Sequence, residues 1–232
     1  MHLFYNPHIQ GDIFELDEQE SKHALRVLRL VRGDAVILID GRGGWYEAEI
    51  LEDHPKRCSL QINSYTPDHR PLPYSLHLAV APTKNMDRYE WFLEKATEIG
   101  ITEITPLICA RSERKQVKAE RLDRILVSAM KQSLKAYKPI LHQAVPMEKF
   151  LTTGRQGILG ITHCHPLERQ SIQNLKPSGT YTFLVGPEGD FTEEELSQAL
   201  EVGYHPFHLG DSRLRTETAA FYLTTAISLR HL

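Results

Sequence analysis

Two glycine-bearing stretches combine residues that could bind a ligand through their backbone. The first, LVGPEGDFTEEEL at residues 184–196, has two glycines and a proline before a run of three glutamates. Glycine-rich turns between a strand and a helix commonly hold phosphate through backbone N–H groups. This stretch has no lysine, and the chain has neither a Walker A loop nor the GxGxxG dinucleotide pattern. Alone, it indicates either a simple tight turn or a pocket for a ligand without phosphate.

The second stretch, LGDSRLRTETAA at residues 209–220, is more polar than a simple connection requires. Arg215, Thr216, Glu217 and Thr218 directly precede the small residues of a helix start. In open α/β sheets, ligands bind outside the carboxyl ends of the strands. Both stretches follow apolar segments that are typical of strands, so they are candidates for such a site.

The elements that must position these stretches form a strand–helix alternation. It begins after a proline-rich linker at about residues 66–73 and predicts a mostly parallel sheet covered on both faces. We expect Gly100 to end a helix, and Thr192 with Glu195 to form a capping box. The expected strands lie at 75–82, 101–109, 157–164, 180–186 and 204–210, and the expected helices at 86–100, 120–134, 192–203 and 216–232.

The first seventy residues have a different pattern. A glycine-rich turn at residues 41–44 separates an apolar run from an alternating one, which predicts a hairpin. A short helix is expected at residues 21–30, with Ser21 as its N-cap. These elements predict a small β-barrel-like domain.

The spaced pair of stretches resembles the ribosomal RNA small subunit methyltransferase E family. HALRVLRLVRGDAVILIDGRGG and KNMDRYEWFLEKATEIGITEITPL, earlier in the chain, are similar to segments of the same family. The resemblance implies a SPOUT-class enzyme that uses S-adenosyl-L-methionine (AdoMet) to methylate N3 of a uridine in 16S, small-subunit rRNA. It also implies a homodimer with a PUA-like RNA-binding β-barrel domain at residues 1–70. A trefoil-knotted α/β methyltransferase domain is implied at 74–232, with the knot roughly at 157–232.

The resemblance also implies which residues bind AdoMet. Because AdoMet carries no phosphate, a glycine loop without lysine suits it, and glycine lets the main chain approach the adenine closely. Asp190 stands where the family commonly has a third glycine, and Ser212-Arg213 replaces an arginine–hydrophobic pair, which leaves open whether Arg213 or Arg215 faces the substrate. The implied cofactor residues are Leu184, Val185, Gly186, Pro187, Glu188, Gly189, Leu209, Gly210, Leu214, Arg215, Thr216, Glu217, Thr218 and Ala219.

Methylation at N3 of uridine requires loss of the imide proton and stabilisation of negative charge on the base. Arg215 is the candidate for stabilising charge on a uracil carbonyl oxygen. Glu217 is the weaker candidate for proton acceptor, because a role at the start of the last helix explains it equally well.

RNA contact must come from local patches, because the formal net charge is -3. Residues 111–138 hold nine Lys/Arg against three Asp/Glu, which favours phosphate contact over the alternative of a solvated helix face with internal ion pairs. A smaller basic stripe in the first domain is either a second contact or the outer face of a short helix. The candidate RNA-binding residues are Arg111, Arg114, Lys115 and Arg121, with His23, Arg26 and Arg29 in the first domain.

The remaining sequence features limit location and partners. The three scattered cysteines are typical of free thiols in a reducing cytoplasm, and neither a signal peptide nor a membrane span is expected. No metal site is expected, since His163-Cys164-His165 lacks a distant pair of ligands; we interpret it as a strand end near the cofactor. The expected partner is small-subunit rRNA or the assembled small ribosomal subunit. A non-catalytic RNA-binding assembly factor on the same scaffold is the alternative function, and phosphate chemistry is disfavoured.

Overall fold

The computed structural model describes residues 2–232, which form two compact units. The first unit contains residues up to Pro71 together with 130–138, and the second contains 72–129 together with 139–232. The basic run at 111–138 is therefore divided between the units at residue 129. Within residues 2–232, no helix is both long enough and apolar enough to cross a membrane.

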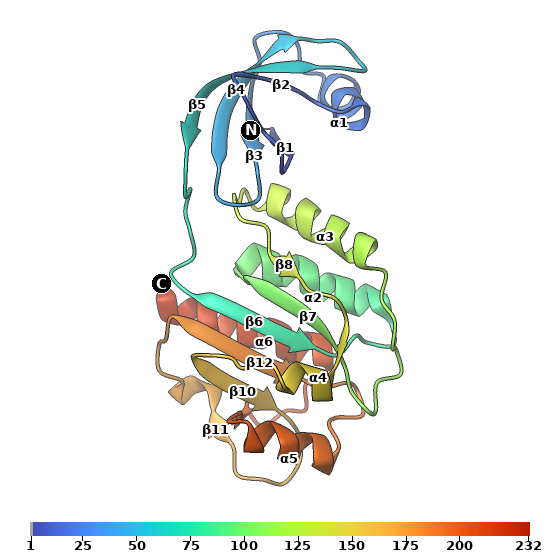
Figure 1. Cartoon of the computed structure of the whole chain (residues 1–232), viewed down its shortest axis with the longest axis vertical. Coiled ribbons are helices and arrows are strands. Elements are labelled where there is room, and N and C mark those ends of the chain that lie inside the picture. Colours follow the sequence, from blue (N-terminus) through green and yellow to red (C-terminus); the bar gives the residue numbers. More distant parts are fainter. Residues whose placement is uncertain (1) are drawn as a thin grey trace. The chain divides into compact units, whose positions relative to one another are not determined.

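The first unit contains a mostly antiparallel sheet with the strand order β1-β3-β4-β5-β2 (Figure 1). Its hairpin turn follows β3, where the Asp40 carboxylate accepts hydrogen bonds from the backbone N–H groups of Arg42 and Gly44. Gly43 has φ 104°, and Tyr137 packs so closely over it that a Cβ there would overlap the phenol ring. The strands are β1 (Leu3–Tyr5), β2 (Ile13–Glu15), β3 (Ala35–Ile39), β4 (Trp45–Glu52) and β5 (Ser59–Thr66).

The short helix of this unit begins earlier than the sequence predicted. Helix α1 (Glu18–Lys22) is capped by Asp17, whose carboxylate accepts from the Glu20 N–H, and it continues as a π-helical turn, η1 (His23–Val27). Ser21 lies inside the helix and is buried, with its hydroxyl bonded to the Leu16 carbonyl and the Cys58 N–H. The prediction that Ser21 caps the helix was wrong, because an earlier residue of the same capping type is available and Ser21 is needed inside.

The second unit is built on a parallel sheet with the order β11-β13-β10-β12-β6-β7-β8, and β9 also pairs with β7. Its strands are β6 (Ser75–Val80), β7 (Glu103–Ile108), β8 (Ile140–Leu141), β9 (Val145–Pro146), β10 (Ile158–Thr162), β11 (Gln170–Ser171), β12 (Thr180–Val185) and β13 (His205–His208). Its helices are α2 (Met86–Ile99), α4 (Met147–Leu151), η2 (Ile172–Asn174), α5 (Glu193–Glu201), α6 (Thr216–Ser228) and η3 (Leu229–His231), and α3 (Ala119–Gln132) spans the division between the units.

Both faces of this parallel sheet are buried, as the near-continuous apolar strands predicted. In β6, Leu76, Leu78 and Val80 belong to a core cluster shared with α2 and α6. Ala79, and Ala81 just after the strand, belong to one shared with α4 and α5. The two helix pairs therefore cover opposite faces of the sheet (Figure 1).

The predicted helix ends are confirmed where side chains or glycine define them. Thr192 accepts from the Glu195 N–H while the Glu195 carboxylate accepts from the Thr192 N–H, which completes the capping box of α5. Gly100 ends α2 with φ 135°, a backbone conformation that other residues rarely adopt.

The connections at the carboxyl edge of the sheet follow from its strand order. Because β13 lies between β10 and β11, the segment 163–169 passes from one side of β13 to the other. The segment 209–215 then leads from β13 to α6, on the face opposite α5. The loops after β10, β12 and β13 consequently meet at one edge.

Candidate cofactor site

A cavity of about 290 Å³ lies where these three loops meet. Strand ends and glycines shape it, because parallel strands deliver their following loops to the same edge. Its lining comes from residues 162–164, 185–188, 207–210 and 212–216, with Arg169, Asp190 and Ala219.

Most of the residues that the sequence predicted for cofactor binding are brought together here. Val185, Gly186, Pro187, Glu188, Leu209, Gly210, Leu214, Arg215, Thr216 and Ala219 line the cavity. Leu184, Gly189, Glu217 and Thr218 belong to the same stretches but are not part of the lining. Leu184 is buried in the core beneath it.

A direct hydrogen bond joins the two glycine-bearing stretches. The Thr216 hydroxyl, at the first residue of α6, donates to the Gly186 carbonyl at 3.0 Å. Glu188 contacts a different segment, the turn after β6, where its carboxylate accepts a hydrogen bond from the Lys84 N–H at 2.9 Å. The loop after β12 is thus held from both sides by groups far away in sequence.

Asp190 adopts a left-handed conformation with φ 62°. One carboxylate oxygen accepts from the Cys164 N–H at 2.7 Å and the other from the Phe191 N–H at 2.8 Å. Asparagine and aspartate tolerate this backbone conformation better than most residues other than glycine. Asp190 therefore takes the conformation that a glycine would supply and also ties the loop after β12 to the loop after β10.

Arg111 also supports the loop after β12. Its guanidinium donates to the carbonyls of Gly189 at 2.9 Å and Phe191 at 3.2 Å, and its side chain packs against Gly189. The sequence placed Arg111 at the ligand edge as an RNA contact, whereas in the structure its guanidinium holds the loop after β12. Its position shortly after a strand was a usable signal, but its hydrogen-bond partners lie about eighty residues away in the sequence.

The two catalytic candidates are placed differently. Arg215 and Arg213 both line the cavity and are both exposed. Both guanidinium groups therefore have access to a bound ligand. Glu217 is buried on α6, and its carboxylate lies 4.0 Å from Nε of Arg88 on α2.

The predicted RNA-binding side chains lie on the surfaces of both units. Arg121 forms an ion pair with Glu90 at 2.6 Å, and Arg114 donates to the Lys84 carbonyl. Lys115 is exposed, as are three residues of the first unit, His23, Arg26 and Arg29.

The loop after β10 also lines the cavity, where the sequence predicted a strand end near the cofactor but named no binding residue. His163 lines the cavity with its ring almost fully buried, and burial beside Arg169 lowers the pKa of the imidazole. Its Nδ1 accepts from the His165 N–H, and within residues 2–232 its Nε2 has no hydrogen-bond partner. Exposed Cys164 and partly buried Arg169 complete this wall. The end of an expected strand at residues 157–164 was the available signal.

Comparisons with known proteins agree with this architecture. A family model described as an RNA methyltransferase domain matches residues 70–228, and one described as an RNA methyltransferase PUA domain matches 16–63. The ribosomal RNA small subunit methyltransferase E of Rickettsia conorii is 31% identical, over 93% of this chain and 89% of that protein.

Solved structures are similar over the whole chain. A probable rRNA-methyltransferase from Porphyromonas gingivalis is 38% identical with a TM-score of 0.93, covering 100% of this chain and 98% of that one. A ribosomal RNA small subunit methyltransferase E from Neisseria gonorrhoeae, solved with bound S-adenosyl methionine, is 27% identical with a TM-score of 0.89, covering 99% and 97%. From its matched domains and its full-length relatives, the chain belongs to the ribosomal RNA small subunit methyltransferase E family.

Proposed function

We propose that the protein transfers a methyl group from AdoMet to N3 of a uridine in small-subunit rRNA. The observation that carries the proposal is the cavity in which the two glycine-bearing stretches meet, within an RNA methyltransferase domain. A relative of the same family was solved with S-adenosyl methionine bound.

The composition of the cavity fits AdoMet. Its apolar lining includes Val185, Leu209 and Leu214, which suit an adenine ring. The carboxylates of Glu188 and Asp190 oppose a polyphosphate but suit a ligand that carries sulfonium and ammonium charges. Within the described residues, no lysine lines the cavity, in keeping with a ligand that has no phosphate.

When bound, AdoMet supplies an activated methyl group, so the protein must orient the base and stabilise the charge that develops on it. Arg215 is the proposed group for a uracil carbonyl oxygen, and Arg213, on the same wall, is the alternative. The role of Glu217 as proton acceptor stays a prediction, because its carboxylate pairs with Arg88 and is not part of the cavity lining.

The RNA itself is proposed to contact basic side chains of both units. Arg26, Arg29 and Lys115 are exposed and free to reach phosphate groups. Arg114 and Arg121 would have to exchange their present hydrogen bonds for RNA, and Arg111 acts through the cofactor loop. The substrate is rRNA or the assembled small subunit, which goes with a cytoplasmic location.

We further propose the homodimer and the knot. Two large side chains on the paired helices α2 and α6 remain exposed, Trp91 at 42% and Tyr222 at 38%, and Trp91 lies 5.2 Å from the Phe221 ring. Such an apolar surface supports a partner chain on this face. The passage of segment 163–169 across β13 supports a knot within 157–232, and the domain boundaries at 1–70 and 74–232 stay predictions.

The function is tested on RNA from a strain that lacks the gene. We expect mass mapping of its small-subunit rRNA to show one uridine without its methyl group, and the purified protein with AdoMet to restore it. An Arg215→Lys variant keeps the charge but not the planar fork, so AdoMet affinity is expected to persist while turnover falls. If all uridine modifications persist in the deletion strain, the substrate assignment is wrong. AdoMet binding without any transfer would support the non-catalytic assembly factor.

A further inference from the structure

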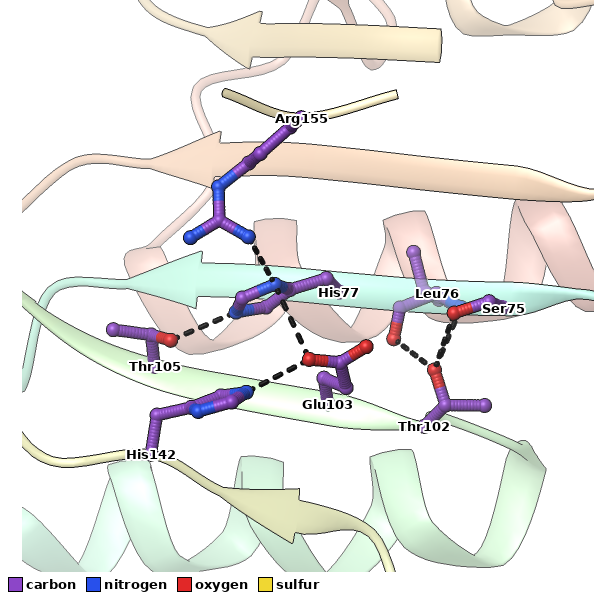
Figure 2. Close-up of polar contacts among 8 residues, drawn as sticks. All are labelled: Ser75, Leu76, His77, Thr102, Glu103, Thr105, His142 and Arg155. Carbon is purple, nitrogen blue, oxygen red and sulfur yellow. Dashed lines mark hydrogen bonds and ion pairs between the residues drawn. The ribbon is translucent and has the colours of Figure 1, made fainter. Parts of the chain in front are cut away.

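A polar cluster lies at the amino ends of the parallel strands, away from the loops that form the cofactor cavity. His77 on β6 and Glu103 on β7 are direct neighbours in the strand register, and His142 follows β8 on the other side of β7 (Figure 2). All three belong to the second unit. The sequence did not indicate this cluster, because its members are 26 and 39 residues apart, too far for a local ligand pattern.

The side chains of these residues converge on a small volume. His142 Nε2 lies 2.7 Å from Glu103 Oε2, and His77 Nδ1 lies 3.7 Å from the same oxygen. One donor atom from each residue falls within 4.8 Å of the other two. Ligands at zinc bond lengths of roughly 2.0–2.2 Å in a tetrahedral site stand about 3.4 Å apart, so only small side-chain shifts separate the cluster from such a site.

The ring of His77 is prepared for a cation at Nδ1. Thr105 Oγ1 lies 2.7 Å from Nε2, and Arg155 Nη1 lies 3.0 Å from Nδ1. Because a guanidinium can only donate, Nδ1 carries the lone pair, and Nε2–H donates to Thr105. Metal-binding histidines usually have the same arrangement, in which the second ring nitrogen donates to a fixed acceptor.

The Arg155 guanidinium donates to His77 Nδ1, the ring atom that a metal ion would bind. Arg155 comes from the connection between α4 and β10, and its guanidinium stacks on the Phe150 ring at 3.9 Å. Within the described residues, its buried Nε has no hydrogen-bond partner, so the group is incompletely satisfied where it lies. His142 and Glu103 have exposed side-chain fractions of 40% and 31%, which gives an ion access from solvent.

We propose that His77, Glu103 and His142 form a binding site for a divalent transition-metal ion such as Zn²⁺, and that Arg155 holds His77 Nδ1 when no metal is bound. Two imidazoles and one carboxylate are the donor set of three-ligand zinc sites that keep a fourth position for water. Mg²⁺ and Ca²⁺ are disfavoured, because they prefer oxygen ligands. A bound ion joins β6 and β7 to the segment after β8, so its role is to stabilise the second unit rather than to take part in methyl transfer.

Calorimetric titration of the full-length, metal-stripped protein with Zn²⁺ tests the site, and Co²⁺ absorption reports its geometry. We expect one equivalent to bind, and His142→Ala and Glu103→Gln each to weaken binding at least tenfold. Both replaced residues are partly exposed, and circular dichroism without metal checks that the variants fold. Arg155→Met, which removes the competing cation, is expected to tighten binding several-fold and to increase the metal-induced rise in Tm.

Two variants serve as matched controls, and neither changes the cluster. Cys164→Ser removes an exposed thiol beside two histidines, and His205→Ala removes an exposed histidine elsewhere in the unit. Zn²⁺ affinity should be unchanged in both. Binding that is lost in Cys164→Ser but kept in Glu103→Gln would place the ion elsewhere and overturn the proposal. Weaker or unchanged binding in Arg155→Met would show that Arg155 does not compete with a metal, which also overturns it.

Discussion

Asp190 provides a quantitative test of how the loop after β12 is held at the proposed AdoMet site. Its carboxylate accepts the backbone N–H groups of Cys164 and Phe191 while its own backbone is left-handed, with φ 62°. Replacement by Ala loses both functions. A hydrogen bond to a charged group contributes about 1.5–3 kcal/mol, and because Asp190 is partly exposed we use the lower end. A left-handed alanine costs about 1–2 kcal/mol more than glycine.

These magnitudes predict an order among three variants. Asp190→Asn keeps an acceptor oxygen and tolerates the left-handed conformation, so the loop should lose about 0.5–1 kcal/mol of stabilisation. Asp190→Gly keeps the left-handed backbone but loses the carboxylate that bonds to the loop after β10, which should cost about 1.5 kcal/mol of stabilisation. Asp190→Ala loses both the carboxylate and the favoured backbone, which should cost about 3 kcal/mol. Since each 1.4 kcal/mol is a factor of ten, AdoMet Kd should rise by up to about tenfold for Gly and about a hundredfold for Ala.

Calorimetry with AdoMet and chemical denaturation of the same samples measure the loss together. If the loop opens in the free protein, the stabilisation lost on replacing Asp190 raises the Kd for AdoMet. If the loop stays closed without ligand, the same stabilisation is lost from the free energy of unfolding. Equal behaviour of the Gly and Ala variants in both assays would refute the backbone argument. A Gly variant equal to wild type in both would refute the bridge between the loops.

Three further predictions concern the second unit. Cys164 is exposed at the cavity, whereas Cys109 is buried and its burial raises the pKa of the thiol. Iodoacetamide should therefore alkylate Cys164 but not Cys109, and saturating AdoMet should slow the reaction at Cys164. If mass spectrometry shows no protection by AdoMet, that would argue against binding in this cavity. Thr192→Ala should lower the free energy of unfolding by about 1 kcal/mol through loss of the α5 cap, with Thr192→Ser close to wild type; equal stability of both variants would contradict the capping role. Gly160→Ala should cost about 1–3 kcal/mol, because its Cβ would overlap a buried phenylalanine ring, while Gly179→Ala, with open space around it, should be nearly neutral; similar melting temperatures would count against this packing.

Local patterns determined much of this protein. Near-continuous apolar segments predicted the buried parallel strands, and the spacing of Thr192 and Glu195 predicted the start of α5, because strand burial and helix capping depend on residues close together in the chain. For the same reason the two glycine-bearing stretches predicted most of the cavity lining that they supply, since each is a continuous loop with its own composition. The cap of α1 was wrong because Asp17 and Ser21 offer the same chemistry, and only burial against Cys58 distinguishes them.

Only the tertiary structure decided which distant groups meet. The Asp190 carboxylate bonds to the loop after β10, and the Arg111 guanidinium donates hydrogen bonds to carbonyls of the loop after β12. The sequence showed the types of both residues but not their partners, because strand order rather than chain order sets which loops are neighbours. The same holds for His77 and Glu103, which become adjacent only through the register of β6 with β7. Sequence spacing reports contacts within one element, whereas contacts between elements depend on how the sheet is assembled.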